Sequence, residues 1–353
     1  MLGLEGRRAA VAALTVLLTV VSGVLSVTGQ DPVLRFVVSG LALAGLAWAV
    51  SVSTEMVGRR VGPGATGVLQ STLGNLPELF VVVFALRAGQ IVVAESSIVG
   101  SLMSNALLVL GLVIVAGTRA AADGQMQFHA RLPNDTSTLF LLSVFTISVL
   151  GVSVSEHDRA SRHAVAISVT GAIVMLVVYG AWLAHYLRTD PTTTTADERP
   201  AATSLVPAVI MLLVAGVGSA FVSDWFVSAL SPAIVTLGIS KMFAGFVIVA
   251  IAGNAVENTV GIVLATKGKN DLAVSVVLNS VAQIAAFLYP ALVLISLLLS
   301  THLTFALPPL LIVAMVLTAV IVWQVIGDGE AYIYEGFALI GLYVVLAAVS
   351  FYE

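Results

Sequence analysis

The sequence predicts an all-α polytopic membrane protein of eleven transmembrane helices, with one N-terminal helix followed by two inverted five-helix repeats. Three observations support this prediction: the composition, a series of apolar segments, and a motif that occurs twice. The chain has 353 residues, of which 59% are hydrophobic and 10% are charged, and its mean hydropathy is +1.08. Soluble domains carry about 25% charged residues. Because no soluble fold could cover this much apolar surface, we expect the solvent to be a lipid bilayer.

Apolar segments of membrane-spanning length recur along the whole chain. A helix needs about 20 apolar residues to cross the hydrocarbon layer. The first segment lacks a small-residue cleavage site, so we expect it to be retained as a helix. The ninth is long enough to be kinked at Pro290. The predicted spans are residues 8–28, 33–57, 63–87, 90–117, 136–155, 163–187, 204–222, 238–266, 271–300, 303–326 and 333–351.

One clearly polar stretch, "RTDPTTTTADERPAATS", separates two halves of the chain. Its threonines, prolines and charged residues can bury little, so it is predicted to be a mobile linker. The predicted organisation has four parts: an N-terminal transmembrane helix at 1–30, a first repeat at 31–187, a cytoplasmic linker at 188–203 and a second repeat at 204–353. Five spans per repeat is an odd number, so the second repeat starts on the opposite side of the membrane, which makes the repeats inverted.

The distribution of lysine and arginine predicts the orientation. With the N-terminus inside, ten of these residues fall on the cytoplasmic side and five on the other. Cytoplasmic loops of membrane proteins are enriched in these residues. We therefore expect a cytoplasmic N-terminus and an external C-terminus. The short termini and the lack of targeting signals favour a prokaryotic plasma membrane, although a vacuolar protein would have a similar core.

The repeated motif is Gly-Asn-x-x-Glu. It reads "GNLPE" up to Glu78 and "GNAVE" up to Glu257, 179 residues later. Polar residues follow at matching distances. Ser101 and Ser280 lie 23 residues after each glutamate, and Ser104 and Gln283 lie 26 residues after. The matching offsets make a chance repeat less probable and place small polar residues on the helix that follows each glutamate.

A glutamate inside an apolar span is costly to place in the membrane, and this cost indicates a functional role for the residue. A charge at the bilayer centre costs about 2.5–3.5 kcal/mol on insertion scales, and a cation, a proton or water offsets that cost. Asn75 and Glu78 are three residues apart and are expected on one helix face, as are Asn254 and Glu257. Pro77 has no N–H group, so the carbonyl of Leu73 should lose its helical hydrogen bond and become available as a ligand. Such oxygen ligands suit Ca²⁺.

The same carboxylates can carry protons. Burial and a second carboxylate both favour protonation, whereas a divalent cation opposes it. Proton and cation would then exclude each other at one site, which is the thermodynamic basis of an antiporter.

At these residues the sequence resembles a known family. "GNLPELFVVVFALRAG…SSIVGSLMSNALLVLG" and "GNAVENTVGIVLATKGKNDLAVSVVLNSVAQIAAFLYPALVL" resemble the two α-repeats of the cation/proton exchangers in the calcium/cation antiporter superfamily. "GDGEAYIYEGFALIGLYVVLA" is similar to the last helix pair of that family. The resemblance implies Ca²⁺/H⁺ exchange by alternating access, with Glu78 and Glu257 as central ligands. It also implies a path lined by Asn75, Asn254, Ser101, Asn105, Ser280 and Gln283.

Some features depart from that family. Asn258 stands where the family usually has His, and Asn279 begins a segment that usually reads Gly-Ser-Ser-x-Gln. These differences leave ion selectivity and stoichiometry open, including Mn²⁺ as substrate. Pro77 is shared with the sodium/calcium branch, so Na⁺-coupled exchange is the alternative on the same fold.

The other acidic residues have weaker assignments. The resemblance places acids at Glu55 and Asp224, each one helix before a motif glutamate. They could steer cations, relay protons, pair with Arg59 or Arg60, or lie on solvated helix ends. Glu95 is predicted to cap the start of the fourth helix, and Asp328, Glu330 and Glu335 are read chiefly as loop and interface acids.

Several function classes are excluded by the composition. The chain has no cysteine, so disulfides, Cys-ligated metals and Cys nucleophiles are ruled out. The five histidines lie at predicted helix ends or loops, with no metal-binding spacing. An intramembrane hydrolase would need a set of catalytic residues inside the membrane spans, and we find none, so we predict no enzyme activity and no cofactor.

Other classes of binding protein are not indicated either. The glycines form no phosphate loop and the basic residues form no nucleic-acid patch. A channel stays possible, but paired repeats favour a transporter, and the oligomeric state is undetermined.

Overall fold

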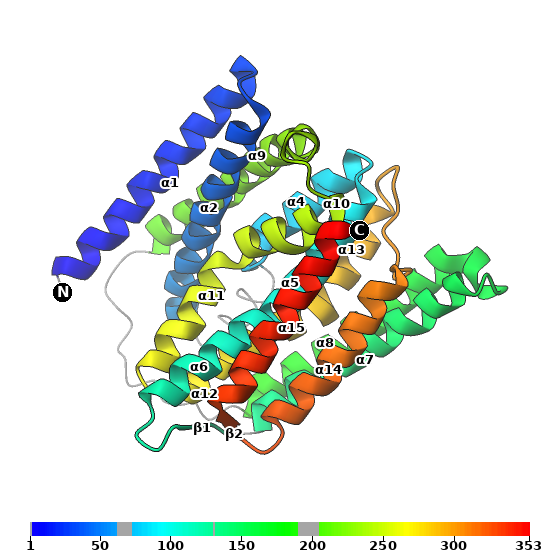
Figure 1. Cartoon of the computed structure of the whole chain (residues 1–353). Helices are drawn as coiled ribbons and strands as arrows, with labels where there is room; N and C mark the ends of the chain where they lie inside the picture. The colour runs from blue at the N-terminus through cyan, green and yellow to red at the C-terminus, as the bar shows by residue number, and fades with distance from the viewer. Residues whose placement is uncertain (1, 62–72, 130, 190–204) are drawn as a thin grey trace. The chain divides into compact units, whose positions relative to one another are not determined.

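The structure, a computed structural model, describes residues 2–61, 73–129, 131–189 and 205–353 (Figure 1). The described elements are almost entirely helical. The helices are α1 (Leu2–Thr28), α2 (Pro32–Val61), α4 (Leu76–Arg87), α5 (Ile91–Met103), α6 (Leu110–Ala120), α7 (Arg131–Ser155), α8 (Ala164–Thr189), α9 (Leu205–Leu237), α10 (Lys241–Phe243), α11 (Ala250–Thr266), α12 (Asn270–Gln283), α13 (Tyr289–Ser296), α14 (Pro309–Ile326) and α15 (Ile333–Tyr352). The short 3-10 helix η2 (Ala160–His163) precedes α8.

Most of the predicted spans are found as helices. Within the described residues, nine helical segments are long and apolar enough to cross a membrane. A tenth would be the pair Lys241–Asn254 and Thr259–Thr266, which is bent by 59°. Of the predicted span 63–87, residues 63–72 lie outside the described part, and α4 alone has 12 residues. The helical membrane class is therefore confirmed, and the count of eleven stays a prediction.

The helices divide into two compact units. The first contains residues up to Ala88 together with Gly180–Ile239, and the second contains Gly89–Tyr179 and Ser240–Glu353. The first unit is built on α1, α2, α4 and α9, with α2 packed along α9. At that contact the rings of Phe36 and Phe226 are stacked with centroids 4.8 Å apart.

Helix α9 is longer than predicted. It has 33 residues and continues through Pro232 to Leu237, whereas the sequence predicts an end near residue 222. The reason is that the apolar composition continues past Asp224, and this side chain is exposed rather than buried. A single acid on the exposed face of a helix does not interrupt it.

Three pairs of consecutive helices in the second unit are joined by π-helical turns. Turn η1 (Ser104–Val109) lies between α5 and α6, η4 (Ala244–Val249) between α10 and α11, and η5 (Ile284–Leu288) between α12 and α13. Such turns insert one extra residue and are frequent at functional sites. The η5 turn has a local cause, because Pro290 follows it and has no N–H to give to the preceding turn. Residues Asn270–Ser296 form one continuous candidate span, with the π-helical turn just before Pro290.

Glycines allow two very close helix crossings in the second unit. A Cβ on Gly100 of α5 would lie 2.2 Å from the carbonyl oxygen of Phe246 in η4. A Cβ on Gly111 of α6 would lie 2.7 Å from the carbonyl oxygen of Gly336 in α15, and the reverse distance is the same. Helices α6 and α15 run side by side (Figure 1). Small residues at such crossings let backbones approach closely in membrane proteins.

The prediction of an all-α chain needs one correction. Strands β1 (Gln125–Gln127) and β2 (Glu330–Tyr332) form a two-stranded antiparallel sheet, with Met126 opposite Ala331. Both strands lie in loops that precede membrane helices, where the backbone groups need partners outside a helix. Met126 and Ala331 are fully buried, so the pair closes one end of the unit. The predicted linker lies almost wholly outside the described residues.

Candidate functional site

The first motif lies where a helix begins. Gly74 and Asn75 form a turn, and α4 starts at Leu76 with Pro77 as its second residue. The sequence predicts that Pro77 lies inside a continuous span, residues 63–87, where it would leave the carbonyl of Leu73 without its helical partner. Instead, Pro77 lies in the first turn of α4. The N–H groups of a first turn have no acceptor within the helix, so a proline there costs no helical hydrogen bond. The break therefore comes before the proline, and Asn75 is the N-cap residue rather than part of a shared helix face.

Both polar side chains of this motif are buried. Glu78 is 4% exposed and Asn75 is 6% exposed. Glu78 lies in the first turn of α4, where the helix dipole stabilises negative charge. The Nδ2 atom of Asn75 is buried and has no hydrogen-bond partner within the described residues. This helix start thus presents a carboxylate and an amide inside the first unit.

A buried network of amides and hydroxyls lies in the second unit. Asn254 of α11 donates from Nδ2 to Ser101 Oγ of α5 at 2.9 Å. Asn105 of η1 donates from Nδ2 to Asn254 Oδ1 at 3.3 Å and to Ser280 Oγ of α12 at 3.2 Å. Each of these four side chains is at most 3% exposed. Four residues predicted for the site, spread over 180 positions of the chain, are therefore in contact.

The geometry fixes the orientation of both amides. Asn254 Nδ2 also donates to the carbonyl oxygen of Ala250 at 3.0 Å. A carbonyl can only accept, so the amide nitrogen of Asn254 must point there and its oxygen must face Asn105. Asn105 then directs its nitrogen into the network. Its Oδ1 atom is buried and has no hydrogen-bond partner in the described part of the chain.

The unpaired Oδ1 atom of Asn105 is a position where a cation or a water molecule could bind. A buried acceptor without a donor costs about 1–3 kcal/mol. A cation or an ordered water at that position would remove the cost. Among the described residues, no group of three or more His, Cys, Asp or Glu residues could hold a metal. A hard cation here would rely on amide, hydroxyl and carbonyl oxygens supplemented by single carboxylates, which is the kind of ligand set that Ca²⁺ accepts.

Two further residues predicted for the site, Gln283 and Glu257, belong to the same helices as Ser280 and Asn254. Gln283 is half-buried at the end of α12, one turn after Ser280. Glu257 belongs to α11, but its side chain is outside the described part, so its predicted role is untested. The bent pair Lys241–Asn254 and Thr259–Thr266 is separated by residues 255–258, which include Glu257.

Comparison with known proteins identifies the family. A family model described as "Sodium/calcium exchanger protein" matches residues 32–187 and 207–352. The chain belongs to this family. Sodium/calcium exchanger proteins are transporters, so the expectation of no enzyme activity is confirmed, as is the multi-pass membrane class.

Relatives of this exchanger family match along most of the chain. A Bacillus subtilis protein named "Ca(2+)/H(+) antiporter ChaA" is 32% identical over 322 residues, covering 88% of this chain and 90% of that protein. A Schizosaccharomyces pombe protein named "Vacuolar calcium ion transporter" is 30% identical over 326 residues, covering 90% and 79%. The solved structure of YfkE matches with a TM-score of 0.82 at 28% identity, covering 97% of this chain and 99% of that one. The resemblance to cation/proton exchangers is therefore confirmed.

The acids predicted at the neighbouring helices of this exchanger are not buried. Glu55 of α2 and Asp224 of α9 are both exposed within the first unit.

One acid was assigned incorrectly. Glu95 was predicted to cap the fourth helix, but α5 begins at Ile91 with Gln90 as its N-cap. Glu95 lies in the second turn and is 8% exposed. The sequence signal for its burial was present, because Glu95 is the only charged residue in "IVVAESSIVGSLM".

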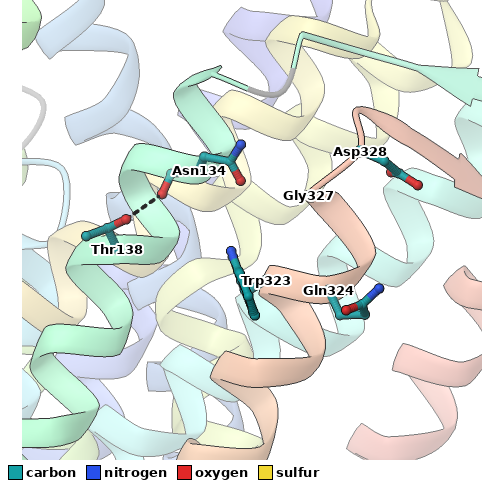
Figure 2. A pocket seen from close by; sticks show the side chains of 6 residues that line it. All are labelled: Asn134, Thr138, Trp323, Gln324, Gly327 and Asp328. Carbon is teal, nitrogen blue, oxygen red and sulfur yellow. Dashed lines mark hydrogen bonds between the residues drawn. The ribbon is translucent and has the colours of Figure 1, made fainter.

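A separate pocket lies at the surface of the second unit (Figure 2). It has a volume of about 430 Å³ and lies against α7 and α14. Its lining residues are Asn134, Thr138, Trp323, Gln324, Gly327 and Asp328. None of them belongs to the predicted site, so this pocket is not the cation path suggested by the motifs.

Proposed function

We propose that this chain is a secondary active antiporter that exchanges Ca²⁺, or a similar divalent cation such as Mn²⁺, for protons by alternating access. The observation that carries the proposal is the buried network around Asn105, which leaves one amide oxygen without a donor. The names of the Bacillus subtilis and Schizosaccharomyces pombe relatives support calcium as substrate, and the former name supports protons as the counter-ion.

In this proposal Glu78 and Glu257 form one shared cation and proton site. Two nearby carboxylates without a counter-ion are unfavourable in a dry environment, and either a divalent cation or protons relieve this. The two ligands therefore compete, and the empty charged site is disfavoured. Asn75, Asn254, Ser101, Asn105, Ser280 and Gln283 would supply further oxygens or orient those that do.

We also propose the inverted-repeat architecture of eleven spans, with the parts at 1–30, 31–187, 188–203 and 204–353. The π-helical turns support it. Turn η1 begins at Ser104 and η5 at Ile284, within one residue of the 179-residue offset between the motif glutamates. Repeats of this kind place substrate sites at their interface near the bilayer midplane. The lysine and arginine bias supports a cytoplasmic N-terminus and a plasma-membrane location.

The decisive experiment is Ca²⁺ uptake into inside-out vesicles with an imposed pH gradient and no sodium. Wild type should take up Ca²⁺, and a protonophore should abolish uptake. Glu78→Gln and Glu257→Gln should each abolish uptake while the protein still folds. The matched control is Glu156→Gln, which changes an exposed loop acid and should transport normally. Robust exchange in either motif variant would refute the role of that glutamate.

Sodium-coupled exchange is the second candidate. The description of the matching family, which names sodium and calcium, favours it, as does Pro77 in the first motif. Ca²⁺ uptake that requires sodium and does not depend on the pH gradient would support this alternative. Uptake without sodium would exclude an obligatory sodium requirement.

A further inference from the structure

The surface pocket of the second unit lies between two packed helices, α7 and α14 (Figure 2). Asn134 and Thr138 are four residues apart on α7, as are Trp323 and Gly327 at the end of α14. This spacing places each pair on one face of its helix. The pocket volume of about 430 Å³ falls in the range of about 300–1,000 Å³ that is usual for small-ligand sites. The pocket is therefore large enough for a small polar group, and the proposed exchange site does not use it.

The pocket lies at one edge of the membrane-spanning helices. Asn134 is the first residue of the candidate span Asn134–Ser155, and Trp323 lies in the last turn of the candidate span Pro309–Ile326. Asp328 follows the second span in the loop before β2. Tryptophan is enriched at this depth, where lipid headgroups lie. A phospholipid can therefore reach the pocket with its headgroup while its acyl chains stay in the hydrocarbon layer.

The charge of the lining favours a positively charged ligand. Among the described residues that line the pocket, Asp328 is the only charged one, and its side chain is exposed. The Asp328 Oδ1 atom accepts the backbone N–H of Glu330 at 3.1 Å, which orients the carboxylate and leaves further lone pairs for a ligand. Gly327, the C-cap residue of α14, also belongs to the lining, so the negative end of that helix dipole lies at the pocket.

An aromatic ring and two amides complete the lining. Trp323 is 52% exposed, and the face of an indole ring attracts a cation. Asn134 of α7 and Gln324 of α14 provide the amides. Within the described part of the chain, neither amide side chain forms a hydrogen bond, so their N–H groups are available to donate to a phosphate. The lining thus suits a headgroup in which a cation and a phosphate are neighbours.

We propose that this pocket binds the headgroup of a phospholipid that carries a primary ammonium group. Asp328 pairs with the ammonium, the Trp323 ring packs against it, and the amides of Asn134 and Gln324 donate to the adjoining phosphate. A primary ammonium fits better than a quaternary one because it has N–H groups to donate to the carboxylate. The site lies in the second unit alone and does not depend on the proposed exchange activity.

The test is lipid titration of the purified full-length protein in detergent, followed by native mass spectrometry. The probes are phosphatidylethanolamine and phosphatidylglycerol with identical acyl chains. Wild type should bind the ethanolamine lipid more tightly. Asp328→Asn should weaken that binding about two- to fivefold, the effect of losing one exposed ion pair, without weakening binding of the glycerol lipid. The matched control is Asp135→Asn, which makes the same charge change at an exposed position outside the lining and should keep the wild-type preference.

A second variant tests the location while Asp328 stays in place. Thr138→Arg adds a cation to the opposite wall at an exposed position and should abolish the preference for the ethanolamine lipid. Ala122→Arg, at an exposed loop position outside the lining, should retain it. Size-exclusion chromatography checks that each variant is folded.

Three results would overturn the proposal. The first is equal binding of the two lipids by wild type. The second is equal behaviour of Asp328→Asn and Asp135→Asn, or of Thr138→Arg and Ala122→Arg. The third is displacement of the lipid by an equal concentration of water-soluble phosphoethanolamine, which would identify a soluble amine as the ligand. None of these readouts requires transport, so failure of the exchange proposal would be seen separately.

Discussion

At the residue scale, Asn254 links three helical elements. Its amide joins Ser101, Asn105 and the carbonyl of Ala250. Hydrogen bonds in membrane proteins contribute about 0.6 kcal/mol each on average. We therefore expect Asn254→Ala to lower the free energy of unfolding in mixed micelles by about 2 kcal/mol. In a double-mutant cycle with Asn105→Ala, the coupling should be about 0.6 kcal/mol.

The matched control for this prediction is Asn134→Ala. Asn134 is half-buried on α7 and lines the surface pocket, so its truncation should change the free energy of unfolding by less than about 0.5 kcal/mol. Strictly additive effects of Asn105→Ala and Asn254→Ala would contradict the observed contact between the two amides.

At the element scale, the crossing of α5 and η4 depends on Gly100. A methyl group there would lie 2.2 Å from the Phe246 carbonyl oxygen and 2.5 Å from its Cα, and both are backbone atoms that cannot rotate away. We expect Gly100→Ala to destabilise the protein by about 1–3 kcal/mol because the helices must separate. The measurement is again unfolding in mixed micelles, with thermal inactivation as a second readout.

Gly341→Ala is the control at this scale. Gly341 lies in α15, and a Cβ at this position would meet nothing within 4 Å. Alanine is favoured over glycine inside a helix by about 1 kcal/mol, so this variant should be neutral or more stable. A Gly100→Ala variant as stable as Gly341→Ala would contradict the close crossing of α5 and η4.

At the scale of the whole molecule, the proposed orientation can be tested because the chain has no native cysteine. Ala122→Cys and Glu156→Cys each place a single thiol at an exposed loop position, on either side of α7. We expect a membrane-impermeant thiol reagent to label Cys at 156 from outside intact cells and Cys at 122 only from the cytoplasmic side. Labelling of both from the same side would show that α7 does not span the membrane, and the reverse pattern would invert the proposed orientation.

The sequence by itself determined the membrane class, most of the spans and the positions of the polar motif residues. Hydropathy is summed over about 20 neighbouring residues, so a span such as 333–351 is visible without knowledge of its contacts. The motif offsets likewise depend only on distance along the chain. For the same reason Glu95 could have been recognised as a buried acid from the apolar residues around it.

Only the tertiary structure decided which polar groups meet. The bonds of Asn105 to Asn254 and Ser280 join residues 149 and 175 positions apart, and helical periodicity gives no information at that separation. The π-helical turns η1 and η4 and the β1–β2 pair were not predictable either, because their backbone hydrogen bonds follow from how neighbouring elements pack. The helix start at Leu76 has a similar origin, since Pro77 permits either a kink or a new first turn. Local composition therefore determined where the chain crosses the bilayer, and long-range packing determined how its polar groups are paired.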